Sequence, residues 1–402
     1  MLWGLGLKSR IDHTYLCRTY SFLCLLTCFV NAFLIHTTTG VTVSDPRIYR
    51  LLDASSNRAV EAVRVVEDIV RFIFNDQMMT REWKTFRHDL CSVLQVLSID
   101  MRLAFRQADA DVGASIALGS EMQRGSVAEI LAANLARLQQ SLRSLEEAGK
   151  LIDADAAQKI EALRYESYTL AAASQTIGVS IDRLQQVKLC VLIDGGASDQ
   201  QFCRLIDMLV SASVGAIQLR EKKVDDSRLM ALARILVAKT RRRKTLSIIN
   251  DRPDIAALAG TDGVHVGQED LSVRDARQIV GPQSVIGVSA HSLDQLNRAV
   301  LEGANYAGIG PIFASKTKQF ATHGGISLLK EVVNQTALPL FAIGGIDTKN
   351  VDTVIEAGAK RVAVAAAITA APDPAQVVAA LHQRLDFANS QAESPDENTP
   401  SR

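Results

Sequence analysis

The stretch Val264–Ser289, VHVGQEDLSVRDARQIVGPQSVIGVS, contains two short apolar runs separated by a polar segment that is long enough for a helix. The first run, Val264–Gly267, and the second, Val285–Ser289, are rich in β-branched residues, as is typical of buried strands. A strand, a helix and a further strand in this order form a βαβ unit with parallel strands. The stretch therefore predicts a parallel sheet covered by helices.

The same alternation continues on both sides of this unit, from about Lys188 to about Asp386. Eight βα units in about 200 residues favour a (β/α)8 TIM barrel, whereas a doubly wound open sheet would have fewer strands and a glycine-rich first turn. A Gly-Ala pair precedes three of the runs, and we expect Gly215, Gly303 and Gly358 to end helices in the left-handed conformation. The eight predicted strands are Leu189–Ile193, Ala216–Arg220, Leu246–Asn250, Val264–Gly267, Val285–Ser289, Tyr306–Gly310, Leu338–Gly344 and Arg361–Ala366.

Residues 46–176 show no alternation of period two, but they have apolar residues at three- and four-residue spacing, which predicts an all-α domain. The domain organisation predicted is a helical domain 46–176, a linker 177–187, a TIM-barrel domain 188–386 and a disordered tail 387–402. The predicted helices are Ser55–Asn75, Thr80–Gln107, Ser126–Lys150 and Ala154–Ser174.

The composition excludes some classes of partner. The chain has 402 residues with 44 basic and 44 acidic side chains, so no net field exists to attract nucleic acid or an anionic membrane, and we expect neither as a partner. The six cysteines show neither metal-ligand spacing nor the density of a disulfide framework, which indicates reduced thiols and a cytoplasmic location. The sequence does not decide whether the protein forms a homo-oligomer.

Residues 1–45 have two interpretations. The apolar run Tyr20–Ile35 follows basic residues, as in a signal peptide, but it contains polar side chains, is short for a membrane span and has no small-x-small cleavage site before Asp45. Either the segment has a targeting role, or the true start of the protein lies downstream, near Val41 or Val43. We expect these residues to be disordered.

Basic side chains follow the second predicted strand. Gln218, Arg220 and Lys222 alternate along an extended chain and therefore point to the same side. Because active sites of TIM barrels lie where the strands end, two cations and an amide there would hold a diphosphate well. The alternative is that Arg220 and Lys222 are ordinary solvated loop charges.

Acidic side chains follow the next two strands. Asp251 ends the third strand and Asp270 follows the fourth, so both would lie at the rim that carries Arg220 and Lys222. Mg2+ prefers few protein carboxylates together with water and phosphate oxygens, which predicts Asp251 and Asp270 as its ligands. The alternative for each is capping of the following helix.

The last four strand ends carry hydroxyls, cations and glycines. Ser289 and His291 follow strand five, and the loop after strand six contains Ser315, Thr317 and Lys318. Strands seven and eight end near Gly345 and near Ala365 and Ala366, where backbone N–H groups can approach a phosphate. We interpret His265 and His291 as structural histidines.

These motifs, in this order and spacing, strongly resemble those of the thiamine phosphate synthase family. The motifs are QLREK (218–222), IND (249–251), GVHVGQED (263–270), GVSAH (287–291), GPIF (310–313) and IGGI (343–346). The resemblance implies an enzyme that joins 4-amino-2-methyl-5-hydroxymethylpyrimidine diphosphate to 4-methyl-5-(2-phosphoethyl)thiazole, giving thiamine phosphate and pyrophosphate with Mg2+ as cofactor. A thiazole-isomerising relative and a non-catalytic barrel that binds thiazole phosphate or thiamine phosphate are the alternatives.

By the same resemblance, each candidate site residue has an expected role. The diphosphate substrate would be held by Gln218, Arg220, Lys222, Asn250, Ser289 and Lys318, and Mg2+ by Asp251 and Asp270. The thiazole phosphate would be held by Ser315, Thr317, Gly345, Ala365 and Ala366. Arg220, Lys222, Lys318 and Ser289 are the expected catalytic residues. Ala366 stands where the family commonly has Ser, which predicts weaker binding of the thiazole phosphate.

The first helix of the helical domain carries a polar stripe, Asn57, Glu61, Arg64, Asp68 and Arg71, and residues 142–150 repeat part of it. The stripe predicts either solvated ion pairs within each helix or a cleft in which Arg64 and Arg143 hold an anion. The segment resembles a helical domain found fused to some thiamine phosphate synthases and linked there to hydroxymethylpyrimidine phosphate kinase activity. No Gly-x-x-x-x-Gly-Lys-Ser/Thr loop is present in the sequence to support a nucleotide site.

Overall fold

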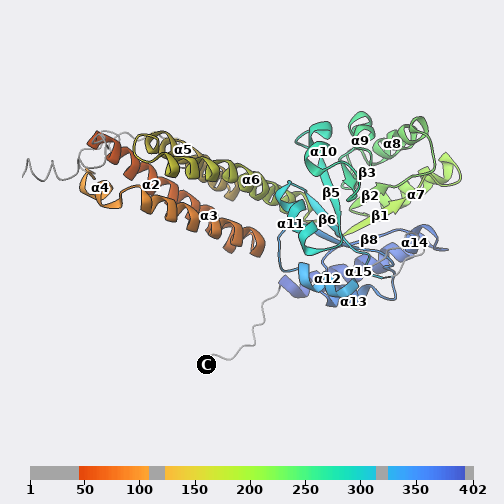
Figure 1. The fold of residues 1–402 in the computed structure, drawn as a ribbon. Coiled ribbons are helices and arrows are strands. Elements are labelled where there is room, and N and C mark those ends of the chain that lie inside the picture. Colours follow the sequence, from red (N-terminus) through yellow and green to blue (C-terminus); the bar gives the residue numbers. More distant parts are fainter. Residues whose placement is uncertain (1–44, 108–122, 314–324, 394–402) are drawn as a thin grey trace, which may run out of the picture.

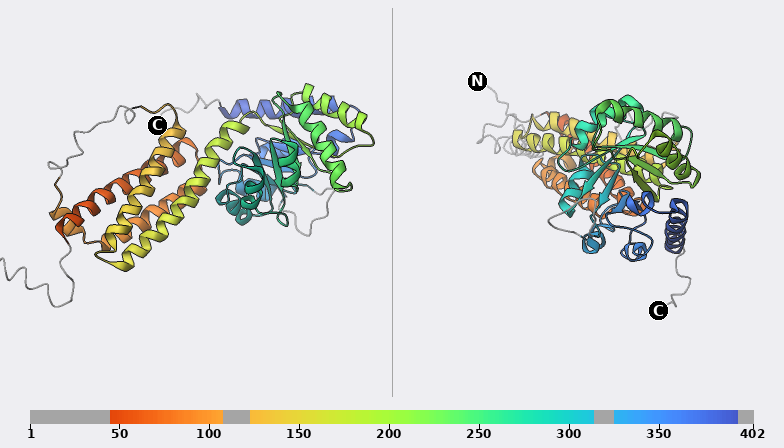
Figure 2. Two further views of the ribbon diagram at one scale, coloured as in Figure 1. Left: turned by 90° about the horizontal axis from the view of Figure 1, so that it is seen from above. Right: turned by 90° about the vertical axis from the view of Figure 1, so that its right-hand side faces the viewer.

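A computed structural model describes residues 45–107, 123–313 and 325–393 of the chain. Long helices form an elongated bundle, and the rest of the chain forms an α/β barrel at one end of it (Figures 1 and 2). An all-α part followed by a TIM barrel is the predicted fold class, and it is confirmed. The predicted targeting segment and most of the last residues of the chain lie outside the described residues.

The bundle is built from α2 to α6. Three of its helices begin at side-chain caps: Asp76, Ser126 and Asp153 each accept a hydrogen bond from a backbone N–H in the first turn of α3, α5 and α6. The bundle core is apolar and includes the fully buried Trp83 and Phe86. The elements are α2 (Pro46–Asp68), the π-helical turn η1 (Ile69–Ile73), α3 (Gln77–Val96), α4 (Ile99–Ala104), α5 (Val127–Gly149) and α6 (Ala154–Leu184).

Two helix predictions need correction. The predicted helix Thr80–Gln107 is interrupted after Val96, because Ser98 has φ of 47°, which no α-helix contains. The predicted linker 177–187 is mostly helical, because α6 continues to Leu184. Ile177 and Leu184 on this extension are 1% and 2% exposed, so tertiary packing supports the helix beyond the predicted end at Ser174.

Eight parallel strands close into a barrel in chain order, β1 to β8, with β8 paired to β1. Every predicted strand is present, with ends that differ by at most two residues. The strands are β1 (Leu189–Ile193), β2 (Ala216–Leu219), β3 (Leu246–Asn250), β4 (Gly263–Val266), β5 (Val285–Ala290), β6 (Tyr306–Ile309), β7 (Leu340–Ile343) and β8 (Val362–Val364).

Helices surround the barrel in the described part of the chain, one or more after each strand. The last of them, α15, continues to Glu393, so residues 387–393 of the predicted disordered tail are helical. The helices are α7 (Asp199–Ser211), α8 (Asp226–Thr240), α9 (Pro253–Ala259), α10 (Val273–Val280), α11 (Leu293–Leu301), α12 (Gly325–Val332), α13 (Val351–Glu356), α14 (Ala366–Thr369) and α15 (Pro374–Glu393).

The expectation that three glycines end helices in the left-handed conformation holds at two of them. Gly303 and Gly358 have φ of 85° and 99°. Gly215 does not take this conformation, and Ser213, with φ of 58°, turns the chain instead. Gly215 is needed for a different reason: a Cβ there would lie 2.9 Å from the Cα of Val187, so close backbone packing requires a residue without a side chain.

The bundle contacts the N-terminal end of the barrel, where the strands begin. The buried carboxylate of Asp76 accepts hydrogen bonds from Thr336 Oγ1 (2.7 Å) and Ala337 N (2.9 Å), which precede β7. Asn305, just before β6, donates to Ser180 of α6 (3.0 Å). Leu184 and Val187 belong to the apolar cluster that fills the barrel interior, so the end of α6 closes this end of the barrel.

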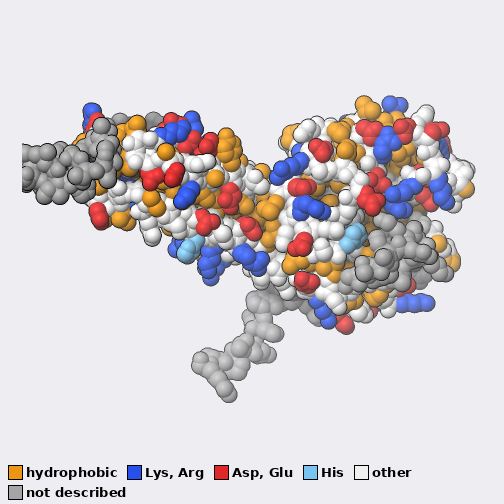
Figure 3. Space-filling model, in the orientation of Figure 1, with side chains coloured by type: hydrophobic (Ala, Val, Ile, Leu, Met, Phe, Trp, Pro, Cys, Tyr) orange, Lys and Arg blue, Asp and Glu red, His pale blue; other side chains and the backbone are white. Residues whose placement is uncertain are grey.

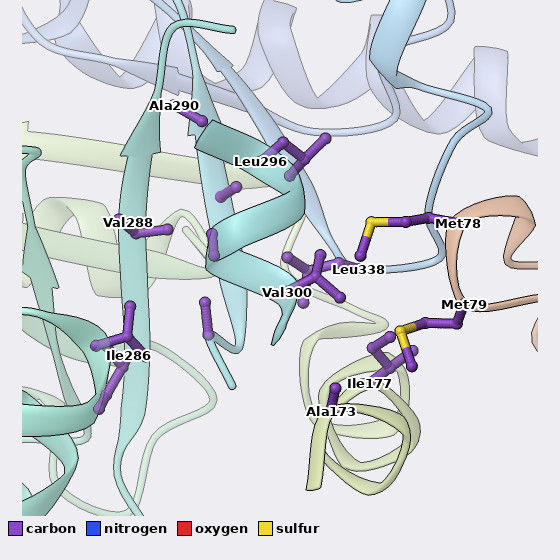
Figure 4. Close-up of a cluster of buried hydrophobic side chains, with 14 of the residues drawn as sticks. Met78, Met79, Ala173, Ile177, Ile286, Val288, Ala290, Leu296, Val300 and Leu338 are labelled. Atoms are coloured by element: carbon purple, nitrogen blue, oxygen red, sulfur yellow. The ribbon is translucent and has the colours of Figure 1, made fainter. Parts of the chain in front are cut away.

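An apolar contact adds to these hydrogen bonds. Met78, Met79 and Ile177 of the bundle lie beside Val300 and Leu338 of the barrel (Figure 4). All of these residues belong to one continuous buried cluster that extends from the bundle into the barrel. The bundle is therefore docked on the face of the barrel opposite to the ends of the strands, where TIM-barrel enzymes bind substrate.

Candidate active site at the barrel mouth

A charged cluster joins the loops after β2, β3 and β4. The ammonium group of Lys222 lies 2.9 Å from Asp251 Oδ2, and the side chains of Asp251 and Asp270 are hydrogen-bonded to each other. Asp270 also accepts a hydrogen bond from Gly267 N (2.6 Å). The three predicted residues therefore form one contiguous group at the mouth of the barrel.

The two carboxyl groups differ in their affinity for a proton. Burial opposes ionisation of Asp251, but the hydrogen bonds from Lys222 and Asp270 outweigh it and lower the pKa of Asp251. Burial and the neighbouring Asp251 raise the pKa of Asp270. Two carboxylates this close repel each other, so Asp270 retains a proton to a higher pH than an ordinary Asp. A cation placed between them would relieve that repulsion.

Neither carboxylate caps a helix, so the capping alternative is wrong. Helix α9 has Arg252 at its N-cap without a side-chain cap, and helix α10 is capped by Ser272. Asp251 instead has φ of 64°, a left-handed conformation that is uncommon outside glycine and found mostly for Asn and Asp. Its backbone N–H donates to His265 O (2.7 Å), which ties the end of β3 to β4.

An amide pair lies next to the charged cluster. Gln218 is only 4% exposed, and its Nε2 donates to Asn250 Oδ1 at 2.7 Å. The contact joins the ends of β2 and β3, which are neighbours in the sheet. It also orients both side chains, and among the described residues the second amide proton of Gln218 and the NH2 group of Asn250 have no other hydrogen-bond partner.

A buried histidine supports Ser289. His265 is 7% exposed, with Nε2 3.0 Å from Ser289 Oγ and Nδ1 3.1 Å from Tyr306 Oη. Burial lowers the pKa of His265 to about 4, so the ring is neutral at pH 7. Both ring nitrogens have partners, which confirms the interpretation of His265 as a structural histidine. Its contact with Ser289 was not predicted.

Four of the other predicted site residues lie in the described part of the chain, and three do not. Arg220, half-buried, directly follows β2, and its backbone N–H donates to Ile193 O (2.8 Å). Gly345 follows β7 with φ of 64°, while Ala365 and Ala366 lie at the start of α14, after the neighbouring strand β8. Ser315, Thr317 and Lys318 lie outside the described residues.

Two polar residues at the mouth were missed. Glu221 accepts hydrogen bonds from Gly195 N (3.1 Å) and Lys223 N (2.9 Å), so it joins the loops after β1 and β2. Gln268 Nε2 donates to Ser289 O (2.5 Å). Both stand inside motifs that carry assigned residues, QLREK and GVHVGQED, and their position beside those residues was the only available signal.

The arginines of the helical stripe take part in ion pairs. Arg143 lies 2.6 Å from Glu146 and 2.8 Å from Glu147 on its own helix, and Arg64 lies 3.7 Å from Glu67. Both arginines are 55% exposed. Ion pairs within each helix engage both arginines, but the faces are not simply solvated: Glu67 and Glu146 are buried. Glu67 also pairs with Arg87 of α3 (2.6 Å), and Glu146 with Arg164 of α6 (2.7 Å). On the face shown in Figure 3, acidic and basic side chains are interspersed over the bundle and the barrel.

A TIM barrel whose mouth holds paired carboxylates beside cationic and amide side chains is the architecture of an enzyme that acts on a phosphorylated small molecule. Comparison with known proteins shows to which enzyme family the chain belongs. Residues 189–368 match the model of the thiamine monophosphate synthase family, and residues 50–173 match that of the ThiD2 family. The chain belongs to the thiamine-phosphate synthase family, whose members are transferases of thiamine biosynthesis.

Relatives resemble the chain over both of its parts. The thiamine-phosphate synthase of Rhodopirellula baltica is 40% identical over 330 residues, which cover 80% of this chain and 88% of the relative. That of Thermosynechococcus vestitus is 38% identical, covering 84% and 95%. A solved thiamine phosphate pyrophosphorylase from Pyrococcus furiosus is 28% identical with a TM-score of 0.46, covering 50% of this chain and 97% of that one.

Proposed function

We propose that the barrel joins 4-amino-2-methyl-5-hydroxymethylpyrimidine diphosphate to 4-methyl-5-(2-phosphoethyl)thiazole and releases pyrophosphate. The observation that carries this proposal is the contact of Lys222 with the Asp251–Asp270 pair, next to Gln218 and Asn250. A site for a diphosphate needs cations and a place for a divalent metal together, and this cluster supplies both. Neither the thiazole-isomerising nor the non-catalytic alternative is favoured by the relatives.

The proposed roles are those that the resemblance to thiamine phosphate synthases implies. Gln218, Arg220, Lys222, Asn250, Ser289 and Lys318 would bind the pyrimidine diphosphate, and Ser315, Thr317, Gly345, Ala365 and Ala366 the thiazole phosphate. The close pairing of Gln218 with Asn250 and of Ser289 with His265 supports the first group, because side chains oriented in advance bind with less loss of entropy.

The paired carboxylates fit Mg2+. This ion takes one or two protein carboxylates and completes its coordination with water and substrate phosphate oxygens. Burial and then the neighbouring Asp251 raise the pKa of Asp270, and a bound cation would relieve the repulsion between the two carboxylates. When bound, Mg2+ would neutralise negative charge on the departing pyrophosphate.

In this proposal Lys222 can pair either with Asp251 or with the diphosphate. Without ligand its ammonium group pairs with Asp251. A metal ion at Asp251 would compete for that carboxylate, and Lys222, 53% exposed, could then turn to the diphosphate. Arg220 and Lys222 would stabilise the charge that develops on the leaving group as the C–O bond breaks. The thiazole nitrogen already carries a lone pair, so bond formation needs no general base.

A direct assay tests the proposal. The purified chain is incubated with both substrates and Mg2+, and thiamine phosphate and pyrophosphate are measured by mass spectrometry and a coupled pyrophosphate assay. We expect equal amounts of the two products, dependent on Mg2+, and strongly reduced formation with Asp251→Asn. Pyrophosphate without thiamine phosphate, or no product at all from folded protein, would contradict the proposal.

The other parts of the proposal concern organisation. A helical domain 46–176 and a barrel domain 188–386 remain our proposed division of the chain, although α6 continues to Leu184 and α15 to Glu393. The three free cysteines of the described residues, Cys91, Cys190 and Cys203, support a cytoplasmic location. Kinase activity of the helical domain stays a prediction. Incubating the chain with ATP and the pyrimidine monophosphate tests it, and absence of the diphosphate would remove it.

A further inference from the structure

A hollow lies in the helical bundle beside α4. Figure 1 shows α4 at the end of the bundle farthest from the barrel. The hollow has a volume of about 280 Å3 and is lined by residues of α2, α3 and α4 and the segment that follows. That size is close to the lower end of the roughly 300–1,000 Å3 typical of small-molecule sites. The lining combines apolar side chains such as Leu94 with the polar groups of Asp53, Asn57, Arg102 and Arg106.

Arg102 is the unusual residue of this hollow. It is only 6% exposed, its Nη2 donates to Leu94 O at 2.8 Å, and its Nε has no hydrogen-bond partner among the residues that the structure describes. A buried guanidinium normally pairs with a carboxylate, because leaving its charge uncompensated is costly. Burial accordingly lowers the pKa of Arg102.

The nearby carboxylate is already occupied. Asp53 accepts two hydrogen bonds from Arg106, from Nε and from Nη2, each of 2.7 Å. This bidentate geometry uses both carboxylate oxygens, so Asp53 neutralises Arg106, and Arg102 has no counter-charge of its own among the residues that the structure describes. The charged groups that line the hollow, Asp53, Arg102 and Arg106, therefore sum to one positive charge.

We propose that this hollow binds a small organic ligand through an oxyanion group, either phosphate or carboxylate, placed against Arg102 and Arg106. The anion would supply the missing counter-charge, while the apolar side chains contact the rest of the ligand. The site is independent of the proposed reaction in the barrel, because the bundle is docked on the face away from the barrel mouth.

Cys91 gives a local measure of occupancy. It lines the hollow and is half-buried, and the half-buried Cys203 on α7 of the barrel serves as an internal reference. The full chain is alkylated with iodoacetamide in short pulses, and the modified peptides are measured by mass spectrometry. Inorganic phosphate, phenyl phosphate and benzoate are each added at about 10 mM, and chloride keeps the ionic strength constant.

We expect at least one of these anions to slow alkylation of Cys91 about threefold or more at saturation, by excluding reagent from the hollow, without slowing Cys203. Arg102→Met should abolish this protection, and Arg102→Lys, which keeps the charge, should retain part of it. Arg81→Met, at an exposed arginine of α3 outside the hollow, is the matched control and should keep full protection.

The comparison of the anions identifies the ligand chemistry. Protection by both phosphates but not by benzoate would assign a phosphate group, and the reverse a carboxylate. Circular dichroism and unchanged synthesis of thiamine phosphate check that each variant is folded. Absence of protection of Cys91 by all three anions in the unmodified chain overturns the proposal, whether or not Arg102→Met folds. Where Arg102→Met folds, protection equal to that of the unmodified chain also overturns it.

Discussion

The ammonium group of Lys222 lies 2.9 Å from the carboxylate of Asp251, on the neighbouring strand end. Asp251 is hydrogen-bonded in turn to Asp270 on the next strand end. Lys222 thus offsets the charge of Asp251, whereas Asp251 and Asp270 still repel each other, and a bound cation would relieve that repulsion.

The first prediction concerns Lys222. Lys222→Met should lower kcat/KM for the pyrimidine diphosphate by about 100- to 1,000-fold, because it removes a cation placed where the leaving group gains charge. Steady-state kinetics measure the effect. Lys223→Met is the matched control: this neighbouring, exposed lysine has no proposed role, and its loss should change kcat/KM by less than about twofold. Equal effects of the two variants would contradict the assignment.

The second prediction separates function from stability at Asp270. Asp270→Asn should abolish most Mg2+-dependent activity and yet raise the melting temperature at pH 7. The pKa of Asp270 is raised in the folded state, so its ionised form costs stability above that pKa, and the cost disappears below the pKa of the unfolded chain. Asn keeps an acceptor for Gly267 N but carries no charge.

Thermal unfolding without metal at pH 7 and at pH 4 checks this sign. The difference in melting temperature between Asp270→Asn and the unmodified chain should be largest at pH 7 and should shrink at pH 4. A variant that is less stable at pH 7 would show that Asp270 stabilises the empty site, contrary to the prediction.

The sequence was sufficient to predict the barrel and the position of most rim residues. Apolar runs such as Leu189–Ile193 define strands, and closure of eight parallel strands brings their ends to one rim, so Lys222, Asp251 and Asp270 could be placed together without knowledge of any contact. The helical bundle was predicted from its periodicity in the same way.

What could not be predicted depends on contacts between residues distant in the chain. The helix break at Ser98 and the left-handed turn at Ser213 have serine, not glycine, at the left-handed position, so the sequence gives no signal for them. The extension of α6 to Leu184 depends on packing against the barrel interior. The contact of His265 with Ser289 joins residues on neighbouring strands, and it requires the register of β4 and β5.

The third prediction concerns the pH dependence of stability through His265. Its pKa is lowered to about 4 in the folded protein, against about 6.5 in an unfolded chain. The unfolded state therefore takes up the proton first, and stability should be lost as the pH falls from about 6.5 to 4, by an amount on the order of 3 kcal/mol. Urea unfolding between pH 7 and 4.5 measures it.

His265→Gln serves as the control for this effect. Glutamine does not titrate, so the free energy of unfolding should fall less steeply over the same pH range. The variant should also lower kcat more than it raises KM, because Ser289 would lose the partner that orients its hydroxyl group. An unchanged pH dependence in the variant would show that another group is responsible.

The last prediction tests the independence of the barrel mouth from the docked bundle. Asp76 is 1% exposed and accepts hydrogen bonds from Met79 N, Thr336 Oγ1 and Ala337 N. Asp76→Ala leaves these donors buried without an acceptor and should lower the free energy of unfolding by about 3 kcal/mol or more. Asp155→Ala, at an exposed acid on α6, should change it by less than about 0.5 kcal/mol. Asp76 contacts the face of the barrel where the strands begin, away from the barrel mouth. We therefore expect kcat at room temperature to be unchanged in folded Asp76→Ala. A large loss of kcat would mean that docking of the bundle shapes the active site.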